Sequence, residues 1–312
     1  MEKRLDIQSI FLLVLLSVVW GVTFPAMKVA LRGFPPILLG GFRFILAGII
    51  VTFFAVLRKE RFVAQSRGSR FLLTFYALAL ALQIILLLIG VQYTSANRCA
   101  IFFNTAPFWV FLLAIFFLPH ENLTRNKWIG VALAFVGVAV MFVEWEGDNG
   151  GVSLTGDVLV LGAAVMWGVR IVVLKYFPKM VGIMTIQVWQ FFIAGSLLTA
   201  LGFSVEKVSE IHLSFSVVMA FLYLVVMSNV AGFLLWTHLV QKEVATRVSP
   251  FMFLTPVFGV LASAVLLKEV ITGYLLMGLV LVGSGIHVVN RQTNAQKASN
   301  RRKENIQGSH LG

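Results

Sequence analysis

The sequence predicts an all-α polytopic membrane protein with ten transmembrane helices in two inverted five-helix repeats. Three observations predict this fold. Of the 312 residues, 59% are hydrophobic and only 12% are charged, with a mean hydropathy of +0.92. That leaves too little polar surface to coat a globule in water. The chain also contains ten apolar segments of membrane-spanning length, and its two halves repeat each other.

The ten segments are expected to be helices because a helix crosses about 30 Å of hydrocarbon with roughly 20 mostly apolar residues. Five belong to each half, joined by an external acidic linker at 147–155. A basic cytoplasmic tail at 291–312 is predicted to be disordered because it lacks apolar periodicity. The first repeat is expected over 1–146 and the second over 156–290, with spans at 10–31, 36–57, 71–92, 96–118, 127–144, 156–176, 182–202, 215–237, 246–267 and 271–290.

The repeat is visible as identical residues at a nearly constant offset. Trp20-Gly21-Val22 and Phe44 recur 147 positions later as Trp167-Gly168-Val169 and Phe191. Further matches at offsets of 148 and 149 extend the repeat, among them Gly130 with Gly278, Gly137 with Gly285 and Pro107 with Pro256. Because each copy crosses the membrane an odd number of times, the second copy must enter from the opposite side. The two halves are therefore predicted to be inverted.

The positive charges predict an orientation, since Lys and Arg accumulate in short cytoplasmic loops. With the N-terminus inside, most basic residues fall on the cytoplasmic side. Only Arg32, Arg98, Lys207 and Lys268 fall outside. Both termini are then cytoplasmic. The net charge of +12 sits mainly in loops beside spans, so anionic lipid headgroups, and not nucleic acid, are the expected partners.

Several short motifs, in order and duplicated, resemble the EamA family of the drug/metabolite transporter superfamily. The resemblance covers roughly 10–290 as two units. It implies a carrier of the bacterial inner membrane, often an exporter of amino acids or other metabolites, with a central cavity between the halves. His120 and Lys268 depart from the small residue usual before the motif's Glu. The motifs are Trp20-Gly21-x-x-Phe24-x-x-x-Lys28, Arg43-Phe44, Thr94-Ser95-Ala96 leading to Pro107, and Glu121 followed by Trp128-Ile129-Gly130, with a second version at Glu269.

Polar and aromatic residues at mid-depth are the candidates for a substrate site. Inverted-repeat carriers bind near the midplane between their halves, where irregular helices line a cavity. Pro107 and Pro256 are predicted to kink equivalent helices there, although membrane helices also tolerate proline without such a role. Each amide could instead make a structural interhelical hydrogen bond, and each tryptophan could simply pack. The cavity candidates are Trp20, Thr23, Gln83, Asn104, Trp167, Arg170, Gln187, Gln190, Asn229 and Trp236.

The charges well inside the predicted spans, away from their ends, are all positive. Arg170 shares a helix face with Trp167, at a position where the first copy has Thr23, and no Asp or Glu lies in the middle of a span. A cationic wall favours a small-molecule substrate that carries a carboxylate. Snorkelling to headgroups or pairing with backbone carbonyls is the other interpretation of Arg170. Without a buried acid, coupling uses an unexpected group or the substrate runs down its own gradient.

The chain is not expected to be an enzyme. No grouping has metal-ligand spacing, no loop is glycine-rich in the manner of nucleotide sites, and Cys99 has no obvious base nearby. No cofactor or metal is predicted. The sequence therefore predicts a secondary transporter that exports amino acids or related metabolites by alternating access. A non-transporting receptor or assembly protein with the same fold is the alternative. The oligomeric state stays open, with a homodimer as one candidate.

Overall fold

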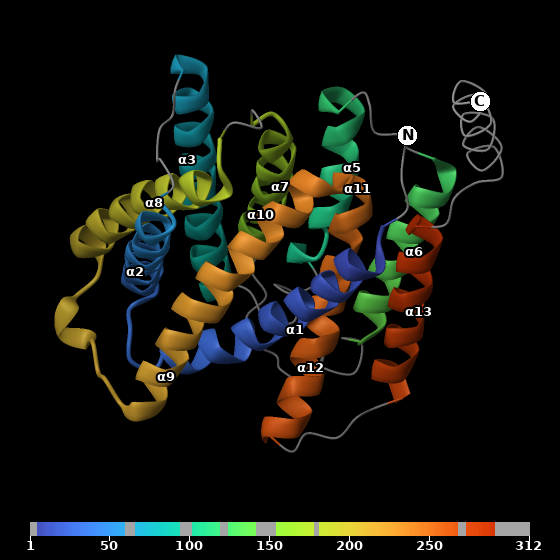
Figure 1. Cartoon of the computed structure of the whole chain (residues 1–312). Coiled ribbons are helices and arrows are strands. Elements are labelled where there is room, and N and C mark those ends of the chain that lie inside the picture. Colours follow the sequence, from blue (N-terminus) through green and yellow to red (C-terminus); the bar gives the residue numbers. More distant parts are fainter. Residues whose placement is uncertain are drawn as a thin grey trace.

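The structure is a computed structural model, which describes residues 5–59, 66–93, 102–118, 124–141, 154–177, 181–267 and 273–290. In these ranges the regular structure is helical. Apart from a short 3-10 helix at Val208–Glu210, the helices fall into ten units that each overlap one predicted span (Figure 1). The predicted fold class is thereby confirmed: the protein is an all-helical membrane protein with ten spans. The joins near residues 94 and 269 lie outside the described residues.

The first half contributes five of these units. The third starts at Arg67, four residues before the predicted span, because the apolar run is extended by a polar turn in which the Ser66 hydroxyl accepts a hydrogen bond from the backbone N–H of Ser69 at 3.0 Å. Asp6 caps the first helix by accepting a hydrogen bond from the Ser9 N–H at 2.6 Å. The helices are α1 (Ile7–Ala30), α2 (Pro36–Leu57), α3 (Arg67–Tyr93), α5 (Ala106–Phe117) and α6 (Arg125–Met141).

The second half contains two composite units. Its third span is continuous from Phe215 to Lys242 but widens into a π-helical segment in the middle. Its fourth span begins with a single α-helical turn and a 3-10 segment. The elements are α7 (Leu154–Lys175), α8 (Ile183–Val205), the short η2 (Val208–Glu210), α9 (Phe215–Tyr223), the π segment η3 (Leu224–Gly232), α10 (Phe233–Lys242), α11 (Ala245–Val248), η4 (Ser249–Phe253), α12 (Leu254–Leu267) and α13 (Gly273–Asn290).

Six described helices are long and apolar enough to cross a bilayer by themselves. They comprise α1, α2, α3, α7, α8 and the composite α9–α10 unit. Large apolar side chains on their outer faces, such as Phe53, Phe71 and Phe215, are exposed, as expected of surfaces that face lipid. The shorter α5 and the last fifteen residues of α13 are also apolar.

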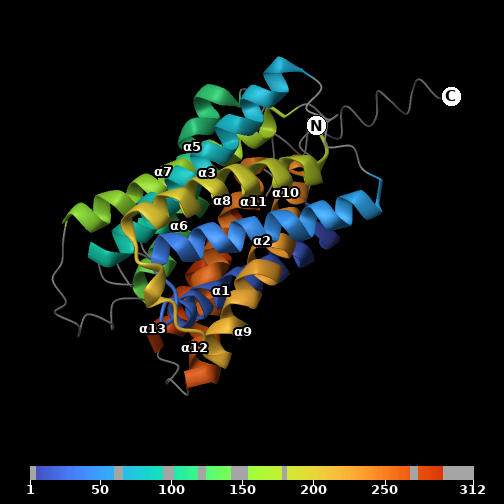
Figure 2. The ribbon, with the colours of Figure 1, turned by 90° about the vertical axis from the view of Figure 1, so that its left-hand side faces the viewer.

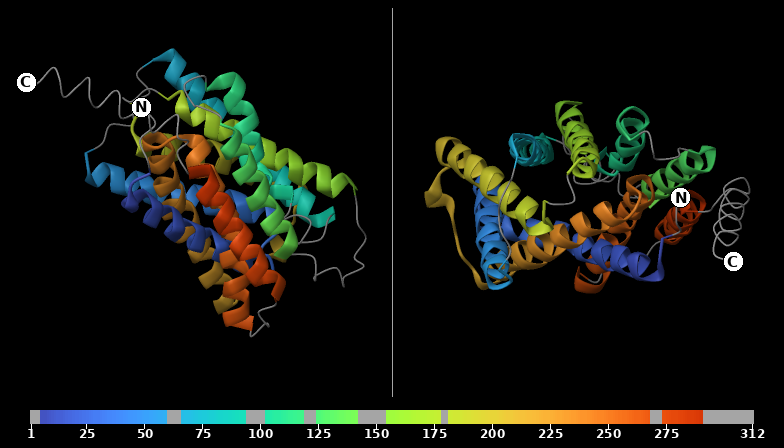
Figure 3. Two further views of the ribbon diagram at one scale, coloured as in Figure 1. Left: turned by 90° about the vertical axis from the view of Figure 1, so that its right-hand side faces the viewer. Right: turned by 45° about the horizontal axis from the view of Figure 1, so that its top comes forward.

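Two pairs of equivalent helices run antiparallel to each other, which is the geometry of inverted halves. In the α6 and α13 pair, a Cβ at Gly130 would lie 2.6 Å from the Gly285 carbonyl oxygen, and one at Gly137 would lie 2.8 Å from that of Gly278. The repeat equates Gly130 with Gly278, so exchange of the halves converts one contact into the other. Figures 1 and 3 show this pair side by side at one edge, with α2 and α8 at the opposite edge.

The α2 and α8 pair obeys the same rule. Phe44 stacks on its repeat equivalent Phe191, with ring centroids 5.7 Å apart and planes inclined by 13°. A Cβ at Gly48 would meet the Phe192 ring, and one at Gly195 would lie 2.9 Å from Ile45. Figure 2 shows α2 and α8 running alongside each other. Each pair therefore joins one half to the other.

The glycine of each Trp-Gly pair is needed for close helix packing. At Gly21, on α1, a Cβ would lie 2.8 Å from the Phe258 Cβ and 2.9 Å from the Thr255 carbonyl oxygen on α12. At Gly168, on α7, it would lie 2.9 Å from the Trp109 Cβ on α5. These contacts are again equivalent by the repeat. The first helix of each half thus packs against the fourth helix of the other half, and this packing directs the adjacent tryptophan into the core.

Candidate functional site

A polar network lies in the apolar core where α3, α7, α8 and α10 meet. Its centre is Arg170 on α7, whose side chain is buried, with 2% of its surface exposed. Its Nη1 donates to Gln83 Oε1 on α3 at 2.9 Å, and its Nη2 donates to Gln190 Oε1 on α8 at 2.7 Å. Three candidates from three helices therefore meet at one guanidinium group.

The network continues through a second glutamine to a fourth helix. Gln190 Nε2 donates to Gln187 Oε1, one turn earlier on α8. Gln187 Nε2 then donates to Thr237 Oγ1 at 2.5 Å and to the Phe233 carbonyl oxygen at 3.1 Å, both on α10. All these side chains are buried. These hydrogen bonds thus form one chain, which runs from the Arg170 guanidinium through the two amides to the acceptors on α10 and fixes the orientation of each amide.

Aromatic rings surround the same guanidinium group. Its carbon lies 4.6 Å from the ring centroid of Tyr76 and 5.6 Å from the rings of Trp167 and Phe233. Each cation–π contact of this kind is worth about 0.5 to 2 kcal/mol, more when desolvated. Among the described residues, no carboxylate pairs with Arg170. The positive charge is held by neutral amides and π faces, so no carboxylate of the described structure neutralises it.

Three tryptophans form a cluster beside Arg170. Trp20, Trp167 and Trp236 lie in a triangle, with ring centroids 5.4, 5.4 and 5.7 Å apart, and Phe233 packs against its edge. The indole N–H of Trp20 donates to the Ser228 carbonyl oxygen at 3.3 Å. Within the described structure, Trp167 Nε1 and Arg170 Nε are buried donors without a hydrogen-bond partner. Such donors are costly unless an acceptor reaches them, and these two lie on one face of α7.

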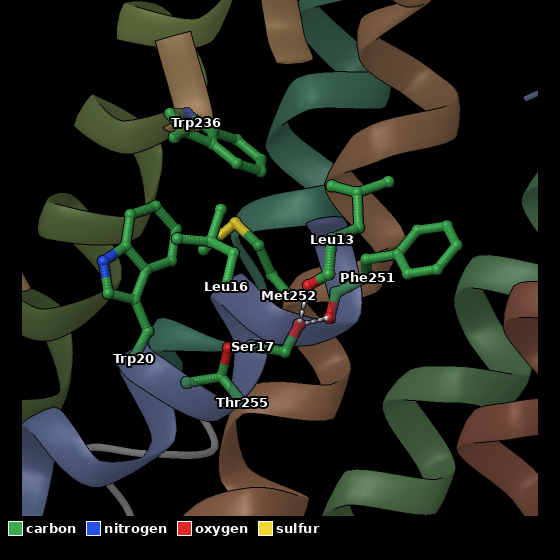
Figure 4. A pocket seen from close by; sticks show the side chains of 8 residues that line it. All are labelled: Leu13, Leu16, Ser17, Trp20, Trp236, Phe251, Met252 and Thr255. Atoms are coloured by element: carbon green, nitrogen blue, oxygen red, sulfur yellow. Dashed lines mark hydrogen bonds between the residues drawn. The ribbon is translucent and has the colours of Figure 1, made fainter. Parts of the chain in front are cut away.

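A narrow pocket opens next to the tryptophan cluster between α1, η4, α12 and α10 (Figure 4). Its empty volume is about 170 Å³, with no room for a water molecule. Trp20 and Trp236 are the candidate residues in its wall, which is otherwise mostly apolar. Ser17 turns its hydroxyl to the Leu13 and Phe251 carbonyl oxygens. The predicted site residues therefore pack closely, and this pocket is the space that adjoins them.

Three polar candidates lie apart from the Arg170 network. Thr23 donates to the Val19 carbonyl oxygen of its own helix at 3.0 Å. Asn229, in η3, donates to the Arg43 carbonyl oxygen at 3.3 Å and so joins the two halves through α2. Asn104 is buried in the turn that precedes α5. The side chains of Thr23 and Asn229 therefore both donate to backbone carbonyl oxygens.

The prolines mark interruptions in their spans. Residues 104 and 105 form a turn, and Pro107 occupies the first turn of α5, where its missing N–H is not needed. Pro256 is the third residue of α12, directly after the 3-10 segment η4. Each proline therefore lies near the start of an α-helix and not, as the predicted spans placed it, about halfway along one. In both halves the α-helix thus begins one or two residues before the proline, after a turn in the first half and after the 3-10 segment η4 in the second.

Sequence reasoning missed three members of the site. Tyr76 lies seven residues before Gln83 and thus two turns away on the same face of α3, and Phe233 lies three residues before Trp236. Both spacings are visible in the sequence and could have indicated a shared face. Thr237 lies four residues after Phe233 and shares its face, but its bond to Gln187 depends on how α8 meets α10.

An ionic cluster joins the start of α1 to the end of α10, away from the Arg170 network. Lys242 Nζ donates to Asp6 Oδ2 at 2.8 Å and to Ser9 Oγ at 3.2 Å, and Ser9 Oγ donates to Glu243 Oε1 at 2.8 Å. Lys175 Nζ donates to the Glu243 carbonyl oxygen. The bond from Lys242, with those from Ser9, holds the pKa of the Asp6 carboxyl well below its usual range.

The family follows from sequence comparison. A model of the EamA-like transporter family matches residues 7–143 and again 154–291. The chain belongs to the EamA-like transporter family. This EamA protein is thus a multi-pass membrane transporter of the drug/metabolite transporter superfamily and not an enzyme. Of the motif residues, those at 94–96, 121 and 269 lie outside the described structure, as do the side chains of Phe24 and Lys28.

Relatives cover nearly the whole chain. "Uncharacterized transporter YvbV" of Bacillus subtilis is 30% identical over 96% of this chain and 97% of its own. A "Probable amino-acid metabolite efflux pump" of Salmonella typhimurium is 29% identical over 89% of this chain and 93% of its own. A solved crystal structure at 17% identity matches with a TM-score of 0.78 over 89% of this chain and 94% of the other, which supports the fold.

Proposed function

We propose that this EamA protein exports amino acids or related carboxylate-bearing metabolites across the bacterial inner membrane, by alternating access between its two inverted halves. The observation that carries the substrate class is Arg170, a buried cation held by neutral groups. A substrate carboxylate would make charge-assisted hydrogen bonds with it, which are about twice as strong as neutral ones. Two relatives carry the name "Probable amino-acid metabolite efflux pump", which supports the same class.

Trp167 supplies a second group for the same substrate. Its unpaired indole N–H lies on the same face of α7 as the unpaired Arg170 Nε. A carboxylate has two oxygens with four lone-pair sites and can accept from both donors. The rings of Tyr76, Trp167 and Phe233 would exclude water and strengthen the attraction.

Alternating access is supported by the interface between the halves. The halves meet through two antiparallel pairs of equivalent helices, α2 with α8 and α6 with α13. Because these contacts are symmetric, the two halves could exchange conformations while the pairs stay packed. In the proposed orientation, with both termini cytoplasmic, the ionic cluster of Asp6, Ser9, Lys242 and Glu243 would lie on the cytoplasmic side. It would then help to close that side in the conformation described here.

The test uses proteoliposomes that contain the purified protein. Vesicles loaded with each of the twenty labelled L-amino acids are compared for efflux with and without a proton gradient. We expect protein-dependent efflux of some amino acids and none of their decarboxylated amines. A folded protein that moves none of the panel, or that moves the amines equally well, would contradict the proposal. The single cysteine at Cys99, once replaced, allows single cysteines in each terminus to test the orientation.

A further inference from the structure

The guanidinium group of Arg170 is closed to any ligand in the conformation described here. The rings of Tyr76, Trp167 and Phe233 cover it at 4.6 to 5.6 Å. Gln83 and Gln190 take one hydrogen from each of its Nη atoms. With 2% of the side chain exposed, no carboxylate can approach unless a neighbouring group moves. A carboxylate oxygen could take the place of the Oε1 atom of either glutamine as the acceptor for an Arg170 Nη donor.

The two amides are held with different strength. Gln190 is fixed by its own amide hydrogen bond to Gln187, which in turn bonds to Thr237 and to the Phe233 carbonyl oxygen. Gln83 has only the bond to Arg170 among the described hydrogen bonds. Displacing Gln190 would disturb a chain that reaches α10, whereas displacing Gln83 breaks one neutral contact. Gln83 is therefore the group that gives way first.

Both positions carry an amide and not a carboxylate, and this difference matters. An amide oxygen satisfies a buried N–H donor, whose desolvation would otherwise be costly, but leaves the positive charge uncompensated. A carboxylate there would form a buried ion pair with Arg170 and compete with any anion from outside. The amide therefore stabilises the empty site without filling it.

Building on the proposed function, we propose that Gln83 is an internal stand-in for the substrate carboxylate. Its Oε1 occupies Arg170 Nη1 in the empty carrier and leaves when a carboxylate binds, while Gln190 keeps the guanidinium in place. Gln83 belongs to the first half, and Arg170 and Gln190 belong to the second. Binding of substrate thus exchanges a contact between the halves for a contact with the substrate. This exchange links occupancy of the site to the relative position of the halves.

The stand-in role predicts opposite effects of two substitutions at one position. Gln83→Leu removes the competing oxygen at similar volume, so the KM for the best-transported amino acid of the panel should fall about threefold to tenfold. Gln83→Glu supplies a permanent counter-ion, so transport of the same amino acid should fall at least about thirtyfold. Gln8→Glu, an exposed site on α1, is the matched control for the added charge and should change transport less than twofold.

The measurement is counterflow in proteoliposomes with variants checked by thermal unfolding and gel filtration. If Gln83→Leu does not fold, Gln83→Asn, whose shorter amide cannot reach Arg170 equally well, should lower the KM in the same direction. A raised KM in the Leu or Asn variant would show that Gln83 binds the substrate directly and would overturn the inference. Undiminished transport by Gln83→Glu would overturn it as well. Absence of carboxylate transport by the wild type would instead contradict the proposed function.

Discussion

The Arg170 region of the second half and its repeat counterpart in the first half share a backbone frame but differ in chemistry. Gly21 and Gly168 make equivalent close contacts, and Phe44 stacks on Phe191. The buried arginine, however, lies on the first helix of the second half but on the second helix of the first half. Where the second half has Arg170 on its first helix and Gln190 on its second, the first half has Thr23 and Arg43.

The two arginines are both buried, but their surroundings differ. Arg43 is 6% exposed, its guanidinium carbon lies 4.9 Å from the Phe44 ring, and its Nε has no partner in the described structure. Arg170 holds two amides and contacts three rings. Duplication thus retained the packing and changed the polar groups, so among the described residues the two arginines have different surroundings.

The largest effect is expected where this comparison is sharpest, at the two arginines. Arg170→Gln should lower kcat/KM for carboxylate substrates about 30-fold to 100-fold, since a lost charge-assisted contact is worth roughly 2 to 3 kcal/mol. Arg43→Gln should stay within about threefold. Initial rates in proteoliposomes with equal amounts of folded protein measure both. Equal losses in the two variants would mean that the asymmetry of the halves has no functional consequence.

The shared frame can be broken at its glycines. Gly21→Ala and Gly168→Ala each place a methyl group within 2.9 Å of a neighbouring helix, so each should destabilise the protein by about 1 to 3 kcal/mol. Thermal unfolding in detergent should show both Tm values lowered to a similar extent. Gly283→Ala on α13 is the control, because a Cβ there meets nothing within 4 Å. A lowered Tm in the control but not in the two variants would contradict the packing account.

Substitutions of Trp167 and Trp20, one in each half, should affect stability and substrate binding differently. Trp167→Phe removes an indole N–H that has no partner, so it should leave Tm nearly unchanged and raise KM for carboxylate substrates about threefold to tenfold. Trp20→Phe breaks the bond to the Ser228 carbonyl oxygen, so it should lower Tm and change KM less. Tm and KM are measured for both variants. A raised KM in Trp20→Phe with a lowered Tm in Trp167→Phe would place the ligand beside Trp20 instead.

The sequence predicts features that depend on neighbouring residues better than contacts between residues far apart along the chain. The ten spans and the repeat follow from local apolar runs and matched residues, and the shared face of Trp167 and Arg170 follows from their spacing of three. The contact between Gln83 and Arg170 joins positions 87 residues apart. No local pattern indicates that α3 lies against α7. The breaks before Pro107 and Pro256 were missed because hydropathy stays high across them.

The smallest effect is expected at the ionic cluster, which lies in the solvent-facing ends of α1 and α10. Because the pKa of Asp6 is lowered below its ordinary 3.8, its contribution is present above that value and is lost as the pH falls through the lowered pKa. Asp6→Asn should therefore change transport less than about twofold, since exposed pairs contribute little. The ratio of wild-type to variant rates should stay constant from about pH 5 to 8. A ratio that changes within this window would show that another group titrates in the cluster.

The central claim is that Arg170 binds the carboxylate of the substrate. The most direct measurement is competition in counterflow by an amino acid and by its carboxamide and decarboxylated amine, in the wild type and in Arg170→Gln. We predict that the wild type prefers the amino acid over both analogues by about 30-fold or more, as a charge-assisted contact implies. We predict that Arg170→Gln loses this preference. A variant that transports the amino acid and keeps the full preference would contradict the claim.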